Sequence, residues 1–597
     1  MADYIVGIDY GHGETAAWVV PLNANNPIGL PMEGTSLRLR ASNEVEDQKL
    51  PSVVYYDKDG NYFLTAKPGC GISGGMKGRA SSFDDRRRNH YKNYIKLIVE
   101  TLLELNSDIL NINDGVPNFR LCMASPTRWN DDEKKEYIEF FNEALAPLNL
   151  RFDWIINESD AAYFTFNDRT SGPNKCSLVI DYGSSTIDYT AMRNGRKISK
   201  DDWSNHQLGA SNIEKSMFES LSPQPDGSGR DDMLAITRSL LLSKDLRHID
   251  PRQFLLFNLR MQKESDYTEG LTDFELIYRF TKPTADAAFS RPLYEFIGNY
   301  DNVTIGYREV VKEDLINLSQ KIKNVNDGNP PDSIVLSGGA SIMRWFKDLV
   351  KEVFGSNEYL EDRNPSFVVA KGIALYARAQ EIALKRFIDR ILSVNYGQIY
   401  KDADIWATKE GVKRFIDRPV RNISSSPITG INIRQIFCEF IRGLNSGNIE
   451  YCDLVQNAVD ESVSKRVSYE LARAIQEVFH VCLSIDDISV HIPVIILDWE
   501  DKAFQPGGSW YDGFTAAVEK ASSRFSFTWD ITRDISEASK IANGVKNLLL
   551  DVDYNNLINY NSEFLDRYGD EIRQQTKKIA IECFFEYQLF KTTFADM

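Results

Sequence analysis

Two segments of the chain share one pattern, in which an apolar strand ends at an aspartate, passes through a turn of small residues and doubles back. Residues 4–20 read YIVGIDYGHGETAAWVV, and residues 178–190 read LVIDYGSSTIDYT. Asp9 and Asp181 stand where the two apolar runs end. A turn of this kind presents backbone N–H groups and hydroxyls to an anion, beside a carboxylate that can hold a hydrated metal ion. Two copies predict two half-sites that close on one nucleotide from opposite sides.

A third segment is expected to bind the base-bearing end of the same nucleotide. Residues 332–341 read DSIVLSGGAS, a strand that runs into Gly338 and Gly339, and a helical pattern follows over residues 342–354. Glycines let the backbone approach a flat ring or a phosphate closely, and a helix N-terminus favours an anion.

These three elements, in this order, resemble the actin-like ATPase superfamily and, within it, the seventy-kilodalton heat-shock chaperones. Residues 155–162 (IINESDAA) resemble the first connecting helix of that family, and residues 125–130 (SPTRWN) resemble the strand end and turn before it. Residues 364–374 (NPSFVVAKGIA) resemble the second connecting helix. The resemblance covers roughly residues 3–380. It implies an α/β fold, a two-lobed actin-like (ribonuclease H-like) ATPase domain over residues 1–380.

The resemblance also implies a site for ATP or ADP with Mg²⁺. The metal would be held, largely through water, by Asp9, Asp181 and Glu158. Lys77 would neutralise charge on the γ-phosphate, Glu158 would orient a water, and Asp181 or Asp188 would accept a proton from the attacking water. The residues expected to bind the nucleotide are Asp9, Gly11, His12, Gly13, Gly183, Ser184, Ser185, Thr186, Gly209, Lys263, Gly338, Gly339, Ala340 and Ile342.

Several of these assignments leave alternatives open. Lys77 lies in the glycine-rich stretch 69–79, where Lys67 and Arg79 compete for the same role and a solvent-exposed loop lysine is the plain alternative. Gly209 lies in a stretch that resembles a glycine turn opening a helix. Residues 254–264 are expected to form a helix that puts Lys263 where the family has a lysine near the adenosine, and a plain surface helix is the alternative.

The first turn departs from the chaperone pattern, because His12, Gly13 and Glu14 stand where two hydroxyl residues are expected. A carboxylate ~4 Å from a phosphate charge costs roughly 4 kcal/mol at an effective dielectric constant of ~20. Glu14 must therefore point away, bind a cation or weaken nucleotide binding. His12 near phosphates would favour its protonated form. We hypothesise that His12 replaces a hydroxyl and couples phosphate state to domain closure.

Local patterns predict further elements around these segments. Residues 50–64 read as a β-hairpin, and apolar residues at helical spacing predict a helix over residues 91–105. Asn130 and Glu133 are spaced as a capping box. Beyond residue 380 we expect a mostly helical accessory domain with few strands. Its predicted elements are helices around residues 467–482 and 572–587 and one strand over residues 488–496.

Composition limits the partners and the compartment. The 597 residues carry a net charge of −17, which argues against a nucleic-acid surface and against binding acidic membranes. The seven dispersed cysteines include no C-x-x-C pair, which is typical of reduced thiols in a cytoplasm. No apolar run reaches the ~20 residues that span a bilayer. We expect two or three domains in a chain of this length.

The leading interpretation is a slow ATPase switch of the chaperone type, with a protein client or co-chaperone still to be identified. An actin-like filament former is the main alternative, and its oligomeric state would distinguish it. A small-molecule kinase and a nucleotide-sensing pseudoenzyme remain further alternatives on the same fold.

Overall fold

We describe the chain from a computed structural model, in which it is a mixed α/β protein. The structure describes residues 3–40, 48–65, 70–74, 77–78, 80–166, 170, 175–193, 196–199, 203–205, 207–210, 212, 255–261, 274–280, 290–292, 305–355, 357–362, 364–407, 409–410, 449–479, 488, 492, 547 and 562–586. The chain divides into two compact units, residues 1–381 and residues 382–593. Among the described residues, no helix is both long and apolar enough to cross a membrane.

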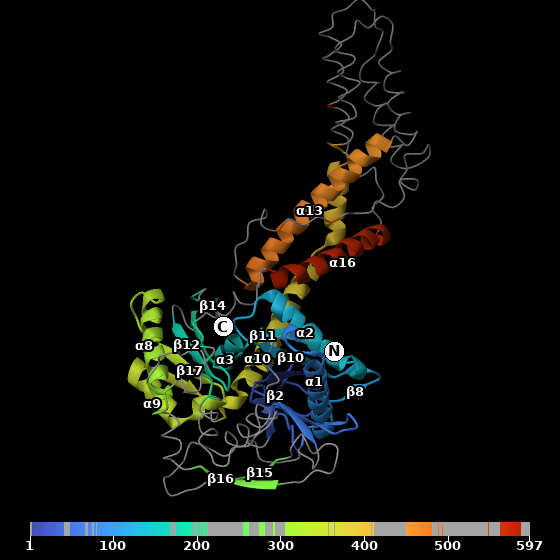
Figure 1. Cartoon of the computed structure of the whole chain (residues 1–597). Coiled ribbons are helices and arrows are strands. Elements are labelled where there is room, and N and C mark those ends of the chain that lie inside the picture. Colours follow the sequence, from blue (N-terminus) through green and yellow to red (C-terminus); the bar gives the residue numbers. More distant parts are fainter. Residues whose placement is uncertain are drawn as a thin grey trace, which may run out of the picture. The chain divides into compact units, whose positions relative to one another are not determined.

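The first half of residues 1–381 is built on a sheet that contains the first turn (Figure 1). Its strands lie in the order β11 (Phe152–Asn157), β10 (Phe119–Ser125), β1 (Tyr4–Tyr10), β2 (Glu14–Pro21) and β3 (Thr35–Ser36), with β4 (Leu50–Pro51) also paired to β2. Strands β1 and β2 form an antiparallel hairpin, whereas β1, β10 and β11 run parallel.

The second half repeats this arrangement around the second turn. Its strands lie in the order β14 (Arg196–Lys197), β13 (Ile187–Arg193), β12 (Cys176–Tyr182), β17 (Ser333–Ser337) and β18 (Glu358–Glu361). Strands β12 and β13 are the antiparallel hairpin, and β12, β17 and β18 run parallel. Each turn therefore joins the central strand of a five-strand order to its antiparallel neighbour.

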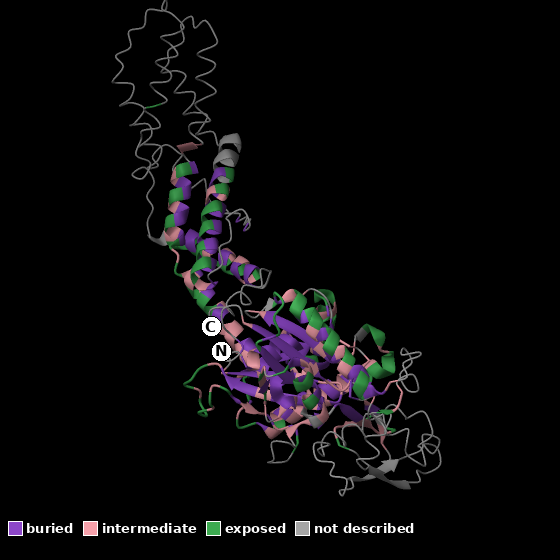
Figure 2. Cartoon of the chain, turned by 90° about the vertical axis from the view of Figure 1, so that its left-hand side faces the viewer, coloured by how far each residue is buried: buried purple, intermediate pink, exposed green. Residues whose placement is uncertain are grey.

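Helices cover the sheets, and the strands between them are largely buried (Figure 2). The first sheet forms a core with α1 (Asp85–Leu105) and α2 (Asp131–Leu145), and the second with α8 (Tyr307–Val325) and α9 (Arg344–Phe354). Helix α3 (Glu158–Thr165) contacts strands of both sheets. Helix α10 (Val368–Leu392) packs against α3 so closely that a Cβ on Gly372 would meet Ala161 backbone atoms at under 3 Å.

Most of the expected local elements are confirmed. The helix expected over residues 91–105 is α1, which buries Tyr91, Tyr94 and Ile98. Asn130 and Glu133 form the capping box at the start of α2, each side chain accepting from the backbone of the other. The hairpin expected at residues 50–64 pairs β5 (Val53–Tyr56) with β6 (Tyr62–Phe63).

Three details differ from expectation. Residues in the glycine-rich stretch form strand β7 (Gly71–Gly74), which pairs with the free edge of β5 although glycine disfavours strands. After Gly338 the chain makes a 3₁₀ turn, η7 (Gly339–Ile342), before α9 begins. The helix expected over residues 254–264 is wrong, because residues Leu255–Met261 form strand β15, which pairs with β16 (Phe274–Phe280). The remaining described elements are η2 (Ala80–Ser82), β8 (Ile112–Asn113), β9 (Val116–Pro117), η3 (Ala146–Leu148) and η8 (Pro365–Phe367).

In residues 382–593 the described elements are helical. They include the end of α10, the helical residues 396–407, α13 (Ile449–Phe479) and α16 (Ser562–Glu586). Val467, Leu471 and Ile475 are buried on α13, as the expected amphipathic pattern requires, and Ile572 and Cys583 are buried on α16. Of the strand expected over residues 488–496, only residues 488 and 492 are described, so this prediction lies outside the described residues.

Candidate functional site

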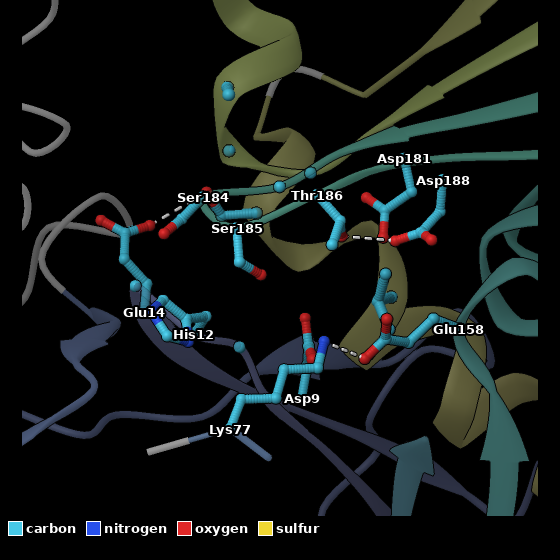
Figure 3. A pocket seen from close by; sticks show the side chains of 18 of the residues that line it. Asp9, His12, Glu14, Lys77, Glu158, Asp181, Ser184, Ser185, Thr186 and Asp188 are labelled. Carbon is cyan, nitrogen blue, oxygen red and sulfur yellow. Dashed lines mark hydrogen bonds and ion pairs between the residues drawn. The ribbon is translucent and has the colours of Figure 1, made fainter. Parts of the chain in front are cut away.

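The two hairpin turns and the glycine pair line one pocket between the sheets (Figure 3). About 660 Å³ of open space, including the solvent at its mouth, lies between these walls. Its lining residues are Asp9, Gly11, His12, Gly13, Glu14, Lys77, Glu158, Asp181, Gly183, Ser184, Ser185, Thr186, Asp188, Gly338, Gly339, Ala340, Pro365, Ser366 and Val369.

The first turn is held in shape by a buried chain of hydroxyl groups beneath it. The Ser52 hydroxyl donates to the Gly11 carbonyl oxygen over 2.6 Å. The Thr15 hydroxyl lies 3.1 Å from the Ser52 hydroxyl and 2.6 Å from that of Tyr94. A Cβ on Gly11 would meet the Glu14 carbonyl oxygen at under 3 Å, so the turn needs glycine there. These contacts fix the backbone of the turn where it lines the pocket.

The second turn is supported from behind by a glycine that does not itself line the described pocket. The Gly183 N–H donates to the Thr186 carbonyl and closes the turn over 3.0 Å, and the Ala210 N–H donates to the Gly183 carbonyl over 3.1 Å. A Cβ on Gly209 would meet backbone atoms of Ser184 and Ser185 at under 3 Å. Gly209 therefore packs against the second turn, and its nucleotide contact stays a prediction.

Lys77 sits among the carboxylates at one end of the pocket, where Figure 3 shows its ammonium group between Asp9 and Glu158. It forms an ion pair with Glu158, the first residue of α3. Burial lowers the pKa of Lys77, but the attraction of Glu158 and Asp9 outweighs it, so the pKa is raised overall and the ammonium stays charged. The competing candidates Lys67 and Arg79 lie outside the described residues.

Three carboxylates face one another at this end. Oxygens of Glu158, Asp181 and Asp188 lie within 4.8 Å of one another. Burial, together with the charges of Glu158 and Asp188, raises the pKa of Asp181 well above its ordinary value. Burial raises the pKa of Asp9 to about 7, with Lys77 lowering it and Glu158 raising it further. A cation would relieve this crowding of acids.

The donor set fits a hard divalent cation such as Mg²⁺. It consists of carboxylate oxygens, the ligands that Mg²⁺ prefers. Asp181 Oδ1 is buried without a hydrogen-bond partner, and so is the Ser184 hydroxyl. Asp188 is partly engaged, because the Thr186 hydroxyl donates to it over 2.7 Å. The cluster includes Asp188, which the sequence indicated only as a base, whereas Asp9 lies with Lys77 and Glu158.

The Gly338–Gly339 pair presents backbone to the pocket, as expected. Gly338 has φ +81°, a left-handed conformation that favours glycine. A Cβ there would meet Asp181 Oδ1 and the Tyr182 carbonyl at under 3 Å. The third segment thus packs directly onto the end of β12 and its aspartate.

Glu14 forms an ion pair with a lysine side chain of the protein. Of the three outcomes considered for Glu14, this is the one in which it binds a cation. Its carboxylate pairs with the Lys49 ammonium over 2.9 Å. The Ser366 hydroxyl donates to the same Glu14 oxygen over 3.2 Å and accepts from Lys49 over 3.2 Å. Neither Lys49 nor Ser366 carried a local signal in the sequence, because each is defined only by residues distant along the chain.

The structure brings together most of the residues expected at the site. All of the expected catalytic and metal-binding residues line the pocket, as do the expected nucleotide-binding residues of both turns together with Gly338, Gly339 and Ala340. Ile342 ends η7. Lys263 lies outside the described residues.

No protein-family model matches the chain, and no curated protein matches it. The function is therefore argued from the site itself.

Proposed function

We propose that the chain is an ATP-binding, slowly hydrolysing switch that resembles the ATPase of the seventy-kilodalton heat-shock chaperones, with the two-lobed actin-like fold. The observation that carries the proposal is the convergence of the two Asp–x–Gly turns and the glycine pair on one pocket. The repeated strand order of the two sheets supports it, because each sheet presents its hairpin turn to the same space.

The charges in the pocket suit a polyphosphate with a divalent cation. Backbone N–H groups of both turns and the Ser184 hydroxyl would bind phosphate oxygens. Mg²⁺, when bound, would offset charge on the β- and γ-phosphates. Glu158, Asp181 and Asp188 supply the carboxylates that would hold it, directly or through water. Gly338 and Gly339 line the same pocket, and the nucleoside would lie beside their backbone.

Hydrolysis requires positioning and charge stabilisation more than covalent chemistry. Lys77 carries its charge where a terminal phosphate would lie, between the two acid-bearing strands and α3. Asp181 or Asp188 would take a proton from the attacking water, and the Thr186 hydroxyl orients the Asp188 carboxylate by donating to its Oδ2. We expect slow turnover, with ADP and phosphate as products.

Isothermal calorimetry of the full chain with Mg–ATP, combined with a phosphate-release assay, tests this proposal. We expect Mg–ATP to bind and to be hydrolysed slowly. Lys96→Met, on the outer face of α1 in an exposed pair with Glu100, is the control and should leave both unchanged. No heat with Mg–ATP or Mg–ADP at high protein concentration would overturn the proposal, whereas binding without turnover would reduce it to a nucleotide sensor.

A further inference from the structure

The wall of the pocket contains a carboxylate that opposes the proposed ligand. Glu14 follows the first turn directly and lines the pocket that the turns form. Its side chain is only 12% exposed, so water screens its charge poorly. An uncompensated carboxylate there would repel a polyphosphate. The chain must therefore neutralise Glu14 if the pocket is to bind one.

Lys49 supplies the compensating charge from outside the lining of the pocket. Its ammonium lies 2.9 Å from Glu14, and its side chain is 16% exposed. Lys49 is not among the described residues that line the pocket, whereas Glu14, its ion-pair partner, is. The Ser366 hydroxyl completes the cluster by bonding to both partners.

The cluster also joins two elements that bound the pocket on different sides. Lys49 directly precedes β4, which pairs with β2 of the first sheet at Glu14 and Thr15. Ser366 lies in η8, which contacts β2 of the first sheet and both η7 and β17 of the second half. The Glu14–Lys49–Ser366 cluster is thus a built feature, with each charged or polar side chain held by two others.

We infer that Lys49 is a positioning residue that makes the pocket permissive for polyphosphates by neutralising Glu14, without touching the ligand itself. The inference rests on the proposed nucleotide-binding function, and it attributes to Lys49 the ability of that site to accept a highly charged ligand. Lys77 and Lys49 then have separate roles: Lys77 faces the phosphates, and Lys49 cancels a carboxylate.

Calorimetry of the full chain with Mg–ATP, Mg–ADP and adenosine tests this inference through the dependence on ligand charge. Lys49→Met leaves the Glu14 charge exposed to the ligand, so we expect about tenfold or greater loss of ATP affinity, a smaller loss for ADP and almost none for adenosine. Lys49→Arg keeps the charge and should stay near wild type.

The double variant Glu14→Gln with Lys49→Met separates action through Glu14 from direct phosphate binding. Because it removes both charges, we expect ATP affinity within about threefold of wild type. A double variant as weak as Lys49→Met would show that Lys49 binds the phosphates itself and would overturn the inference. An equal loss for adenosine and ATP would also overturn it, since that is the signature of a structural defect.

Two further results keep the test decisive. If Lys49→Met does not fold, Glu14→Gln alone decides: the inference requires ATP affinity to stay equal or increase, and a tenfold loss contradicts it. Wild-type protein that binds none of the ligands overturns the proposed function along with this inference. Wild-type binding with no charge-dependent change in Lys49→Met overturns this inference alone.

Discussion

Asp9 and Asp181 are acids whose burial costs the ligand-free protein stability. Burial raises the pKa of Asp9 to about 7 and that of Asp181 well above its ordinary value. At a pH between the unfolded and the folded pKa, each carboxyl is therefore protonated in the folded protein and ionised in the unfolded chain. The contribution of these two carboxyls to the free energy of unfolding is therefore fully present below the unfolded pKa and is lost as pH rises through the folded pKa.

We therefore expect the melting temperature of the ligand-free protein to fall as pH rises from about 4 towards and above about 7. Asp181→Asn removes one of the two groups, so it should flatten this fall and raise the melting temperature near neutral pH by a few degrees, roughly. Differential scanning fluorimetry across the pH range measures both effects. A slope identical to that of wild type would contradict the assignment.

Lys77 is the charge that should matter most for the rate. Removing one preorganised charge contact to a transition state typically costs on the order of 10²–10³ in rate. We expect Lys77→Met to lower the single-turnover rate of ATP hydrolysis by about that factor. Lys77→Arg, which keeps the charge, should lose less. Equal rates for wild type and Lys77→Met would assign the role to another cation.

At the scale of elements, what the sequence predicts well is local. Each strand–turn–strand segment is written in consecutive residues, so β1–β2 and β12–β13 were predictable from alternation and small residues alone. The capping box of α2 is equally local. The repeat of the pattern indicated that both turns serve one site, but the pairing of β12 with β17 in the second sheet is set by residues far apart.

What the sequence could not predict depends on tertiary contacts. Strand β7 forms because β5 offers an unpaired edge, which outweighs the low strand propensity of its glycines. The neutralisation of Glu14 depends on Lys49 and Ser366, which carry no motif. Gly209 was predictable as important, but its role behind the second turn is visible only from the packing of its Cα.

The second turn should be sensitive to the element behind it. Gly209→Ala places a methyl group against the backbone of Ser184 and Ser185, so we expect at least tenfold weaker Mg–ATP binding and a lower melting temperature. Gly183→Ala is the matched comparison, because its Cβ would meet only the Thr186 carbonyl oxygen at an ordinary 3.5 Å. It should retain the wild-type melting temperature. Equal melting temperatures for the two variants would refute the packing role.

The interface between α3 and α10 should be equally intolerant of added volume. Gly372→Ala drives a methyl group into the Ala161 backbone, and overpacking of this kind costs about 1–3 kcal/mol or more. Since α3 begins at Glu158, a displaced α3 also moves a carboxylate of the acid cluster. Urea denaturation measures the loss of stability, and a wild-type midpoint would contradict the close packing.

At the scale of the whole molecule, the repeated sheet order gives residues 1–381 two similar halves, and residues of both halves line the pocket. A ligand held by turns from both halves binds best when both engage it, so it favours the arrangement in which they are drawn together. Helix α3 contacts strands of both halves, and α10 packs against α3. A movement of the halves relative to each other would therefore shift both helices. The proposed switch therefore predicts that nucleotide changes protease sensitivity in segments away from the pocket as well as at the pocket.

We expect Mg–ATP and Mg–ADP to give different patterns of limited proteolysis over the whole chain, including cleavage sites in residues 382–593. Mass spectrometry of the fragments locates those sites. His12→Ala tests the coupling hypothesis, because His12 lines the pocket within the first turn. The substitution should reduce the nucleotide-dependent difference in cleavage more than it reduces nucleotide binding. If nucleotide alters cleavage only within residues 1–381, the nucleotide state does not change the conformation of residues 382–593. Unchanged turnover and unchanged nucleotide-dependent cleavage in His12→Ala would instead remove His12 from the switch, because its imidazole would then contribute neither to phosphate binding nor to closure.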